Sequence, residues 1–474
     1  MTQAMDIPPA RACTAAPASA RTADIGWLGV FRLGLVQAAL GAMVVLTTST
    51  LNRVMVVELA LPALLPGLLV ALHYLVQVTR PRMGFGSDVG GRRTPWIVGG
   101  LAVLALGAVG AAVATAWMGT ARVPGVMLAV LCFVLIGAGV SAAGTNTLVL
   151  LAKRVPAQRR APAATIVWMM MIFGLAFTAV LAGKLLDPFS PARLVAVMAA
   201  VCAAAFVLAL LALVGVEGGV QGPGGAAAEP AEAAPPRFRQ ALAEVWAEPE
   251  ARRFTIFVFV AMLAFSAQDL ILEPFAGSIF GWTPGQTTQL SGLQHGGVLA
   301  GMVLVAVAGA GVLGRRFGSL RGWAVGGCLA SALALCGLVA AGAVGPGWPL
   351  AANVFLLGAA NGAFSIAAIA SMMALASAGR QRREGVRMGL WGAAQAVAFG
   401  LGGVLGTAAS DLARWLLGSP VLAYTSVFAL EALLFVVSAW LAAQLRQPTP
   451  IVSSSSRREA QSLAEPAVAF SQQR

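Results

Sequence analysis

Twelve long apolar segments, separated by short polar connections, constrain this chain more than any other feature. They cover residues 27–57, 61–78, 95–118, 123–151, 163–186, 192–216, 254–275, 289–313, 323–344, 350–378, 388–412 and 419–443. A helix needs roughly 20 apolar residues to cross the hydrocarbon core of a bilayer. Hydrophobic residues make up 59% of the chain and charged residues only 10%, compared with about 25% charged in a soluble domain. The pattern predicts an all-α membrane protein with twelve transmembrane helices.

The basic residues predict how the chain crosses the membrane. The connections after the second, fourth, eighth and tenth segments carry 4, 4, 3 and 4 Lys or Arg residues, and the other short connections carry few. Lys and Arg accumulate on the cytoplasmic side of membrane proteins. We therefore expect these four connections, and both termini, in the cytoplasm. That arrangement requires an even number of crossings, which agrees with the count of twelve.

The two halves of the chain match each other at an offset of 223 residues. The matched pairs are Gly91-Arg92-Arg93 with Gly314-Arg315-Arg316, Gln158-Arg159-Arg160 with Gln381-Arg382-Arg383, Trp168 with Trp391, and Gly139 with Gly362. Duplicated halves of this kind are typical of secondary transporters. We expect an N-terminal six-helix bundle at 27–216 and a C-terminal six-helix bundle at 254–445, related by pseudo-symmetry.

Three polar stretches flank and join the predicted bundles. Residues 1–26 and 446–474 have the composition of disordered cytoplasmic tails, and the first has no apolar core of the kind found in a cleaved signal peptide. Residues 217–253 form a cytoplasmic linker. Within the linker, 238–247 places its large apolar residues on one helical face, which favours a short helix on the membrane surface. A mobile linker accounts for the same residues equally well.

The connection after the second segment carries a motif. Residues 84–93 read GFGSDVGGRR, with Gly84, Asp88, Gly91, Arg92 and Arg93 in register. Glycines let two helix ends approach closely, a carboxylate stabilises a helix N-terminus, and arginines keep the loop on the cytoplasmic side. The pattern resembles the loop between helices two and three of the major facilitator superfamily. An ordinary basic loop of a multispan protein is the alternative.

Charged residues inside apolar segments are the next candidates for function, because their burial in hydrocarbon costs several kcal/mol. Asp269 and Glu273 are spaced i, i+4 on one face of the seventh segment, and Arg53 lies at the far end of the first. At 1.5 Å per residue, Arg53 and Glu273 reach a similar depth. We expect an Arg53–Glu273 or Arg53–Asp269 pair that closes the periplasmic side. The alternative is that each charged group reaches the interface by itself.

Composition also excludes several classes of function. The net charge of +13 is spread over connections between apolar segments, so it indicates membrane orientation and no nucleic-acid partner. The five cysteines include no CxxC pair, and two histidines are too few for a metal site rich in His. No Walker-type phosphate loop is present, so transport driven by ATP is not supported. We expect no catalytic residues, no metal site and no intrinsic cofactor.

Four stretches together resemble one branch of the superfamily. They are RLGLVQ at 32–37, Asn-Arg-Val-Met at 52–55, QDLILEP at 268–274 and GLWGAAQA at 389–396. They are similar to the PucC/LhaA family, the bacteriochlorophyll delivery branch of the major facilitator superfamily. The resemblance implies a twelve-helix fold and a non-enzymatic carrier or chaperone that delivers bacteriochlorophyll and assembles light-harvesting complexes in the intracytoplasmic photosynthetic membrane. It implies as partners bacteriochlorophyll or a precursor, light-harvesting apoproteins or pigment-synthesis enzymes, and membrane lipid.

The two histidines, His73 and His295, are candidate pigment ligands. A neutral imidazole in an apolar site can ligate the magnesium of a chlorin ring, although a lone membrane histidine more often hydrogen-bonds a neighbouring helix. Two other functions stay open. One is a proton-coupled secondary transporter of a small molecule, with Asp269 and Glu273 as titrating groups. The other is a membrane enzyme that acts on pigment.

Overall fold

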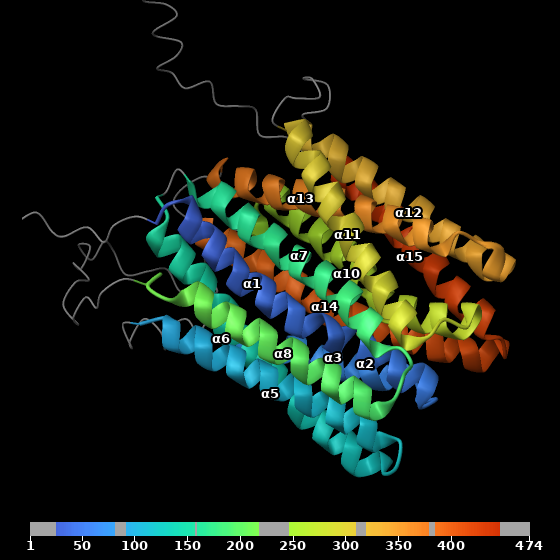
Figure 1. The fold of residues 1–474 in the computed structure, drawn as a ribbon. Coiled ribbons are helices and arrows are strands. Elements are labelled where there is room, and N and C mark those ends of the chain that lie inside the picture. Colours follow the sequence, from blue (N-terminus) through green and yellow to red (C-terminus); the bar gives the residue numbers. More distant parts are fainter. Residues whose placement is uncertain are drawn as a thin grey trace, which may run out of the picture.

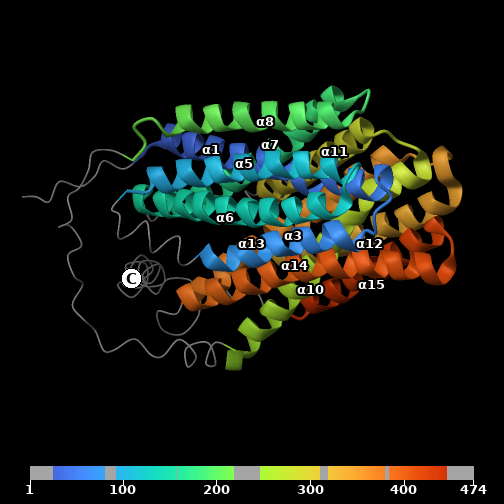
Figure 2. The ribbon, with the colours of Figure 1, turned by 90° about the horizontal axis from the view of Figure 1, so that it is seen from below.

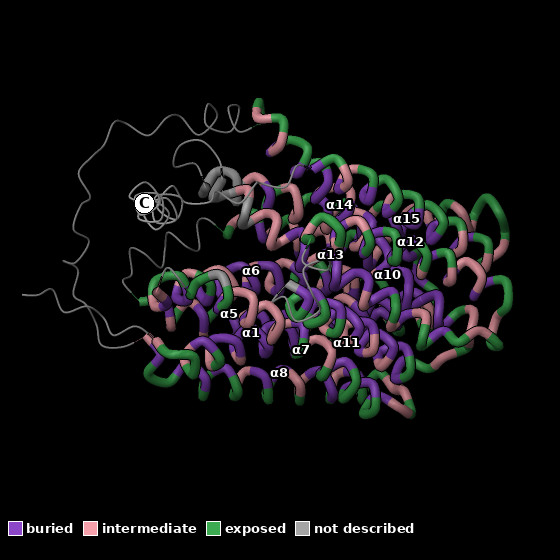
Figure 3. The backbone as a smooth tube through the Cα atoms, turned by 90° about the horizontal axis from the view of Figure 1, so that it is seen from above, coloured by how far each residue is buried: buried purple, intermediate pink, exposed green. Residues whose placement is uncertain are grey.

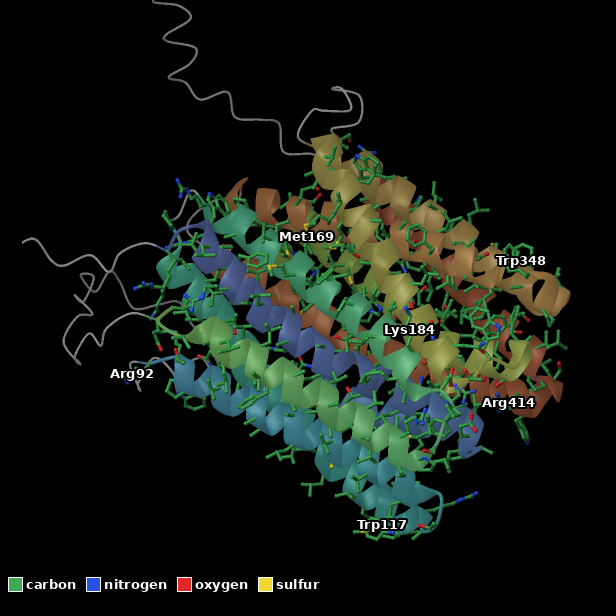
Figure 4. All side chains as sticks on the ribbon, viewed as in Figure 1. Arg92, Trp117, Met169, Lys184, Trp348 and Arg414 are labelled. Atoms are coloured by element: carbon green, nitrogen blue, oxygen red, sulfur yellow. The ribbon has the colours of Figure 1, made fainter. Side chains whose placement is uncertain are left out.

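The computed structural model is all-helical in the part of the chain that it describes, which comprises residues 25–80, 92–156, 159–217, 246–309, 319–378 and 384–445. Long helices run up and down through one elongated bundle (Figure 1). Arg92 lies at one end of this bundle, whereas Trp117, Lys184, Trp348 and Arg414 lie toward the other end (Figure 4). Successive helices therefore alternate in direction, as a chain that crosses a membrane repeatedly must do.

The first half contains six membrane-crossing elements. The elements are α1 (Trp27–Thr48) continued by α2 (Thr50–Arg53) and the π-helix η1 (Val54–Glu58), α3 (Leu64–Val76) continued by the 3-10 helix η2 (Gln77–Thr79), α5 (Thr94–Met118), α6 (Arg122–Arg154), α7 (Arg160–Leu186) and α8 (Pro191–Leu213). The second half repeats this number. Its elements are α10 (Pro249–Phe280), α11 (Pro284–Gly309), α12 (Leu320–Val344) with the short η5 (Gly345–Gly347), α13 (Leu350–Ala378), α14 (Glu384–Leu417) and α15 (Pro420–Ala443).

In these described ranges, 11 helices are long and apolar enough to cross a membrane, and Leu64–Thr79 is a shorter apolar helix. Together they account for the twelve predicted segments. The all-α class and the twelve-helix arrangement are thereby confirmed.

The described helices form two large hydrophobic cores, one built from α1 to α8 together with Leu270 of α10 and the other from α10 to α15. A third, smaller cluster joins Ile172 of α7 to residues of α11 and α13, among them Val298 and Ile366. The two sets of helices lie side by side when the molecule is turned (Figure 2). Buried residues run through the middle of the bundle and exposed residues cover its outer faces (Figure 3), as expected where lipid replaces water as the solvent of the apolar surface.

The two halves meet along two long helix pairs, α7 with α11 and α3 with α14. Glycines permit the close approach in both pairs. A Cβ atom on Gly67 of α3 would stand 2.1 Å from the Thr407 hydroxyl of α14, and one on Gly183 of α7 would stand 2.6 Å from the Gly285 carbonyl of α11. Small residues serve this role in membranes, where helix association depends on van der Waals packing and hydrogen bonds.

The two matched glycines of the repeat occupy equivalent sequence positions but pack against different helices. Gly139 of α6 packs against Gly100 and Leu104 of α5, whereas its match Gly362 of α13 packs against Val298 of α11. Of the other matched pairs, Trp391 is buried against Phe254 at a ring distance of 4.9 Å. The pairs that include Gly91, Gln158, Gln381 and Gly314 to Arg316 extend outside the described residues.

Several helix boundaries differ from the predicted ones, and α10 and α11 each begin five residues earlier than expected, at Pro249 and Pro284. α10 begins at Pro249, inside the stretch predicted as linker, because proline is favoured in the first turn of a helix, where no N–H is needed. The first crossing is not a uniform helix either, since its last turn is the π-helix at Val54–Glu58.

Several predicted features lie outside the described residues. Gly84, Asp88 and Gly91 of the motif are among them, as are both tails and nearly all of the segment 238–247. Of the motif, Arg92 is exposed and Arg93 is buried at the start of α5.

Close packing at Gly362 gives a stability prediction. A Cβ at this position would stand 2.0 Å from the Val298 carbonyl, so Gly362→Ala must push α13 away from α11. We expect a loss of about 1–3 kcal/mol, measured as a lower thermal unfolding temperature in detergent. Gly326→Ala on α12 is the matched control, because nothing lies within 4 Å of its Cβ. Equal stability of the two variants would contradict the proposed packing.

Candidate functional site

A polar layer closes one end of the interface between the halves, and the first crossing supplies much of it. The Ser49 hydroxyl donates to the Glu273 carboxylate of α10, and the Thr50 hydroxyl lies 2.9 Å from that of Thr288 on α11. The Asn52 amide donates to the backbone carbonyl of Leu270 at 2.6 Å. Ser49, Thr50 and Asn52 are all buried. These three polar residues at the end of the first crossing thus all contact the second half.

Arg53 extends the closed layer but does not form the expected direct pair. Its guanidinium forms an ion pair with Glu58 and donates to the Trp282 carbonyl at 2.8 Å. The π-helical turn explains the difference, because i to i+5 hydrogen bonding brings Glu58 back beside Arg53. Arg53 is nevertheless near α10, where a Cβ on Gly277 would stand 3.0 Å from the guanidinium.

Glu273 therefore has Ser49 as its direct partner, and the charge of Arg53 acts on it from a greater distance. Its second carboxylate oxygen has no well-aligned hydrogen-bond partner among the described residues, although the Thr287 and Ser291 hydroxyls of α11 also act on this carboxyl. Asp269, the other expected partner of Arg53, instead accepts a hydrogen bond from Gln294. The structure thus brings Arg53 and Glu273 to the same end of the interface but assigns different partners to them.

Two aspartates each cap a helix of the opposite half. Neither of them was identified from the sequence. Asp187, directly after α7, accepts from the Thr283 hydroxyl at 2.7 Å and from the Gly285 N–H at 3.3 Å, at the start of α11.

Asp411 of α14 accepts from the N–H groups of Ala63 at 3.0 Å and Leu64 at 2.8 Å, at the start of α3. The first N–H groups of a helix have no partner within it and carry partial positive charge. Both carboxylates thus tie one half to the other, and their sequence offset is within one residue of the repeat. A comparison of acidic positions between the halves could have revealed them.

An aromatic row crosses the interface deeper in the bundle. The Tyr74 ring of α3 lies 5.5 Å from Phe399 of α14, and Phe399 lies 5.8 Å from Phe265 of α10. All three rings are half-buried. Phe265 is followed one helical turn later by Asp269, which is also half-buried and accepts a hydrogen bond from Gln294 of α11 at 3.3 Å. This cluster offers flat apolar surfaces beside a small number of polar groups.

The histidines have different surroundings. His295 follows Gln294 on α11, is half-buried, and its Nδ1 lies 2.8 Å from the Ser291 carbonyl. A carbonyl only accepts, so Nδ1 carries the proton and Nε2 keeps its lone pair. No described residue binds that Nε2.

His73 is buried on α3, and its Nε2 lies 2.8 Å from the amide nitrogen of Gln77. Arg80 donates to the carbonyl oxygen of the same amide, which fixes the amide nitrogen as a donor to the His73 Nε2. The lone pair of His73 is therefore already used.

The described side chains include no group of three His, Cys, Asp or Glu residues arranged to hold a metal ion. We call Tyr74, Phe265, Phe399, Asp269 and Gln294 the polar–aromatic cluster. Together with His295, it offers three aromatic rings, a carboxylate paired with an amide, and one imidazole lone pair. These groups suit binding of a flat, largely apolar molecule with a Lewis-acidic centre or a polar edge.

A lipid-facing groove of about 1010 Å³ lies elsewhere, between α11, α12 and α13. Leu304, Gly326, Leu333 and Leu356 are among its lining residues. It contains none of the charged residues or histidines considered above, so we place the candidate site between the halves and not in this groove.

At the other end of the bundle, Glu217 caps α5. Its carboxylate accepts from the backbone N–H groups of Arg93 and Thr94, the latter at 2.9 Å. Burial opposes ionisation, but hydrogen bonds from Thr94 and from the two N–H groups outweigh it and lower the pKa of Glu217. The end of α8 is thereby fastened to the first residue after the motif arginines.

Removal of the two aspartate caps is expected to open the closed end of the interface between the halves. Asp187→Ala combined with Asp411→Ala removes two cross-half caps, each of which contributes about 0.5–2 kcal/mol. We expect a new population of longer distances between spin labels at Thr120→Cys and Gly347→Cys, measured by double electron–electron resonance in a background without native cysteines. Ser190→Ala is the control, because Ser190 caps its own helix through the Arg193 N–H. An unchanged distance distribution in the double variant would count against a closing role for the caps.

The contact between the Glu217 carboxylate and the start of α5 is expected to be sensitive to acid. A lowered pKa means that the ionised carboxylate stabilises this contact above the ordinary value of 4.5, and that the stabilisation is lost as the pH falls through the lower folded-state pKa. Glu217→Gln should speed amide hydrogen exchange at Arg93 and Thr94 relative to the native protein at neutral pH. The difference should shrink in acid, and a difference that stays constant with pH would refute the carboxylate cap.

Comparison with known proteins places the chain in a family. The sequence profile of the family described as "PUCC protein" matches residues 50–449. A Rhodobacter capsulatus protein named "Bacteriochlorophyll synthase 44.5 kDa chain" is 54% identical over 88% of this chain and 95% of its own length. The "Protein PucC" of Cereibacter sphaeroides is 31% identical over 85% of this chain and 88% of its own.

Solved structures resemble the fold at low sequence identity. The D-xylose–proton symporter aligns with a TM-score of 0.65 at 16% identity, over 88% of this chain and 97% of its own. A bacterial homologue of the lysosomal transporter Spinster, in an inward-facing and unoccupied conformation, aligns with a TM-score of 0.63 at 15% identity, over 89% of this chain and 98% of its own. The fold is that of the major facilitator transporters, and the chain belongs to the PucC family.

Proposed function

We propose that this protein is a non-enzymatic carrier that delivers bacteriochlorophyll during assembly of light-harvesting complexes. The observation that carries the proposal is the free Nε2 of His295, the residue that directly follows Gln294 of the polar–aromatic cluster on α11. The name of the Rhodobacter capsulatus relative, a bacteriochlorophyll synthase chain, supports the same cargo class.

His295 suits the magnesium of a chlorin. The magnesium binds four ring nitrogens and accepts a further ligand from one face, and a neutral imidazole nitrogen is such a ligand. The Ser291 carbonyl holds the Nδ1 proton at 2.8 Å, which fixes the tautomer and the ring orientation, as second-shell partners do for metal-binding histidines. His295 therefore meets the requirement that His73 does not.

The neighbouring side chains suit the rest of the macrocycle. Tyr74, Phe265 and Phe399 present half-buried rings to a flat conjugated molecule, and offset or edge contacts between such rings are favourable. Gln294 and Asp269 supply the polar groups that orient a ligand in an otherwise apolar site. Because these residues come from both halves, cargo bound here would contact both cores.

The residues of the cluster favour carriage over catalysis. They bind and orient, and the polar pair Asp269–Gln294 joins a carboxylate to an amide instead of to a second acid or base. The synthase name of one relative describes that protein. We propose that the present chain hands pigment or a precursor to light-harvesting apoproteins or takes it from pigment-synthesis enzymes, in the intracytoplasmic photosynthetic membrane.

Proton-coupled transport of a small molecule is the second candidate. It is favoured by two carboxylates on α10, Asp269 and Glu273, of which Glu273 is buried with one oxygen that has no well-aligned hydrogen-bond partner among the described residues. Uptake that depends on a proton gradient and does not require pigment would support it.

The pigment proposal predicts an asymmetry between the histidines. Purified from a pigmented host, the His295→Ala variant should carry about tenfold less bacteriochlorophyll than the native protein, since loss of one metal ligand is expected to cost at least about 1.4 kcal/mol. His73→Ala should retain pigment, because its lone pair already accepts a hydrogen bond. Absorption spectra normalised to protein measure both. Equal pigment in the native and His295→Ala proteins would exclude His295 as the ligand, and native protein without pigment would contradict the carrier.

A further inference from the structure

An acidic residue outside the candidate cargo site lies in the interior of the second half. Glu431 of α15 is 2% exposed, and neither of its carboxylate oxygens has a hydrogen-bond partner among the residues that the structure describes. Gln268 of α10 is fully buried, and both polar atoms of its amide are also unpartnered. Buried polar groups in native structures are nearly always hydrogen-bonded. Two such exceptions in one pair of helices therefore require an explanation.

The packing of α10 against α15 places these two residues in one interface. Phe275 of α10 lies 5.1 Å from Phe428 and 5.8 Å from Tyr424 of α15, measured between ring centroids. Gln268 precedes Phe275 by seven residues, so it lies on the same face of α10. Glu431 follows Phe428 by three residues on the α15 face that packs against α10. Because the two helices run in opposite directions, both residues lie on the same side of the Phe275–Phe428 contact, Gln268 about 10 Å and Glu431 about 4.5 Å from it along the helix axes.

Asp269 of α10 is the other carboxyl whose ionisation would oppose that of Glu431. Asp269 itself turns toward α11, where Gln294 donates to it at 3.3 Å. Two carboxylates that interact within an apolar interior cannot both be ionised without a large electrostatic cost. Adjacent residues of α10 thus connect Glu431 to the carboxylate of the candidate cargo site.

The other helices that pack against α15 bring no charge near Glu431 among their described side chains. On α14, Arg414 donates to the Tyr424 hydroxyl at 2.9 Å. Tyr424 precedes Glu431 by seven residues of α15, which is about 10 Å along the helix. On α12, Arg321 donates to the carbonyl of Ala443, about 18 Å from Glu431 along the helix. The thiols of α12 are Cys328, which is buried, and Cys336, which is exposed.

Within the described part of the chain, an ionised Glu431 would have no positive partner and no hydrogen-bond donor. A charge in that state is among the most expensive groups to bury. The carboxyl is therefore neutral in the conformation described here, with one proton on an oxygen that has no other partner. Ionisation would require the interface between α10 and α15 to admit water or to rearrange.

We infer that Glu431, with Gln268 and Asp269, forms a proton-binding site that couples the opening of the closed layer to proton exchange. Proton binding forms one O–H bond on the Glu431 carboxyl with a proton taken from water, and release returns that proton to water. The link to the closed layer is α10 itself. Its residues 268 to 273 include Gln268 facing α15, Leu270 accepting from Asn52, and Glu273 accepting from Ser49. A shift of α10 that solvates Glu431 would therefore strain the contacts that close the layer.

The test is the pH dependence of the distance between the halves. Spin labels at Thr120→Cys and Gly347→Cys report that distance in purified full-length protein, from about pH 5 to pH 9, the range in which buried carboxyls titrate. We expect the native protein to gain a population of longer distances as the pH rises. Glu431→Gln, a neutral isostere, should abolish the pH dependence and stay closed. Glu431→Asp should retain a pH dependence, and Asp269→Asn should shift its midpoint without abolishing it.

Infrared spectra of the native protein give a second readout that does not depend on a variant. A neutral carboxyl stretching band should disappear over the same pH range as the distances change, and it should be absent in Glu431→Gln. Native distances that do not change with pH, a pH dependence retained in Glu431→Gln, or no neutral carboxyl band would each overturn the inference. His295→Ala separates this result from the pigment proposal, because it should lose cargo while keeping the pH dependence of the distances.

Discussion

The arrangement depends on hydrogen bonds that cross between the two halves at one end of the bundle. Apolar surface in a bilayer gains little from contact with other apolar surface, because lipid is as apolar as the helix. Close contact of α7 with α11 and of α3 with α14 holds the halves together through packed glycines, but such packing does not by itself select one end to be closed. The closed end is selected by four side chains that each hydrogen-bond a buried or helix-terminal polar group of the opposite half. They are Ser49, Asn52, Asp187 and Asp411.

The architecture was predictable from the sequence because lipid imposes a simple rule on it. Segments that cross a membrane must be apolar, helical and about one bilayer long, so the twelve segments and the all-α class followed from composition and spacing. Helix ends were less accurate. α10 begins earlier than expected, at Pro249, where hydropathy is low but the helix still forms. The π-helical turn after Arg53 has no hydropathy signal, and that turn redirected Arg53 from Glu273 to Glu58.

The site was only partly predictable. Charged residues in apolar segments drew attention to Arg53, Asp269 and Glu273, and the structure brings Arg53 and Glu273 to one end of the interface. Their partners depend on side-chain geometry that no spacing rule supplies, as the Asp269–Gln294 contact illustrates. Asp187 was missed because it directly follows a helix, and Asp411 because it lies at the end of the predicted segment 388–412, and acidic residues are common at such positions. Glu431 was missed because one acidic residue in the last segment shows no pattern until its neighbours on α10 are known.

The proposed pigment site is chemically simple, with one imidazole oriented by the Ser291 carbonyl and a few aromatic rings that both halves supply. The most direct test is titration of bacteriochlorophyll into purified, pigment-free protein, followed by visible circular dichroism. The account predicts an induced dichroic signal that saturates at one pigment per chain, because an asymmetric site orients the ring and ligates its magnesium. A spectrum identical to that of pigment in empty detergent micelles, at every ratio, would contradict it.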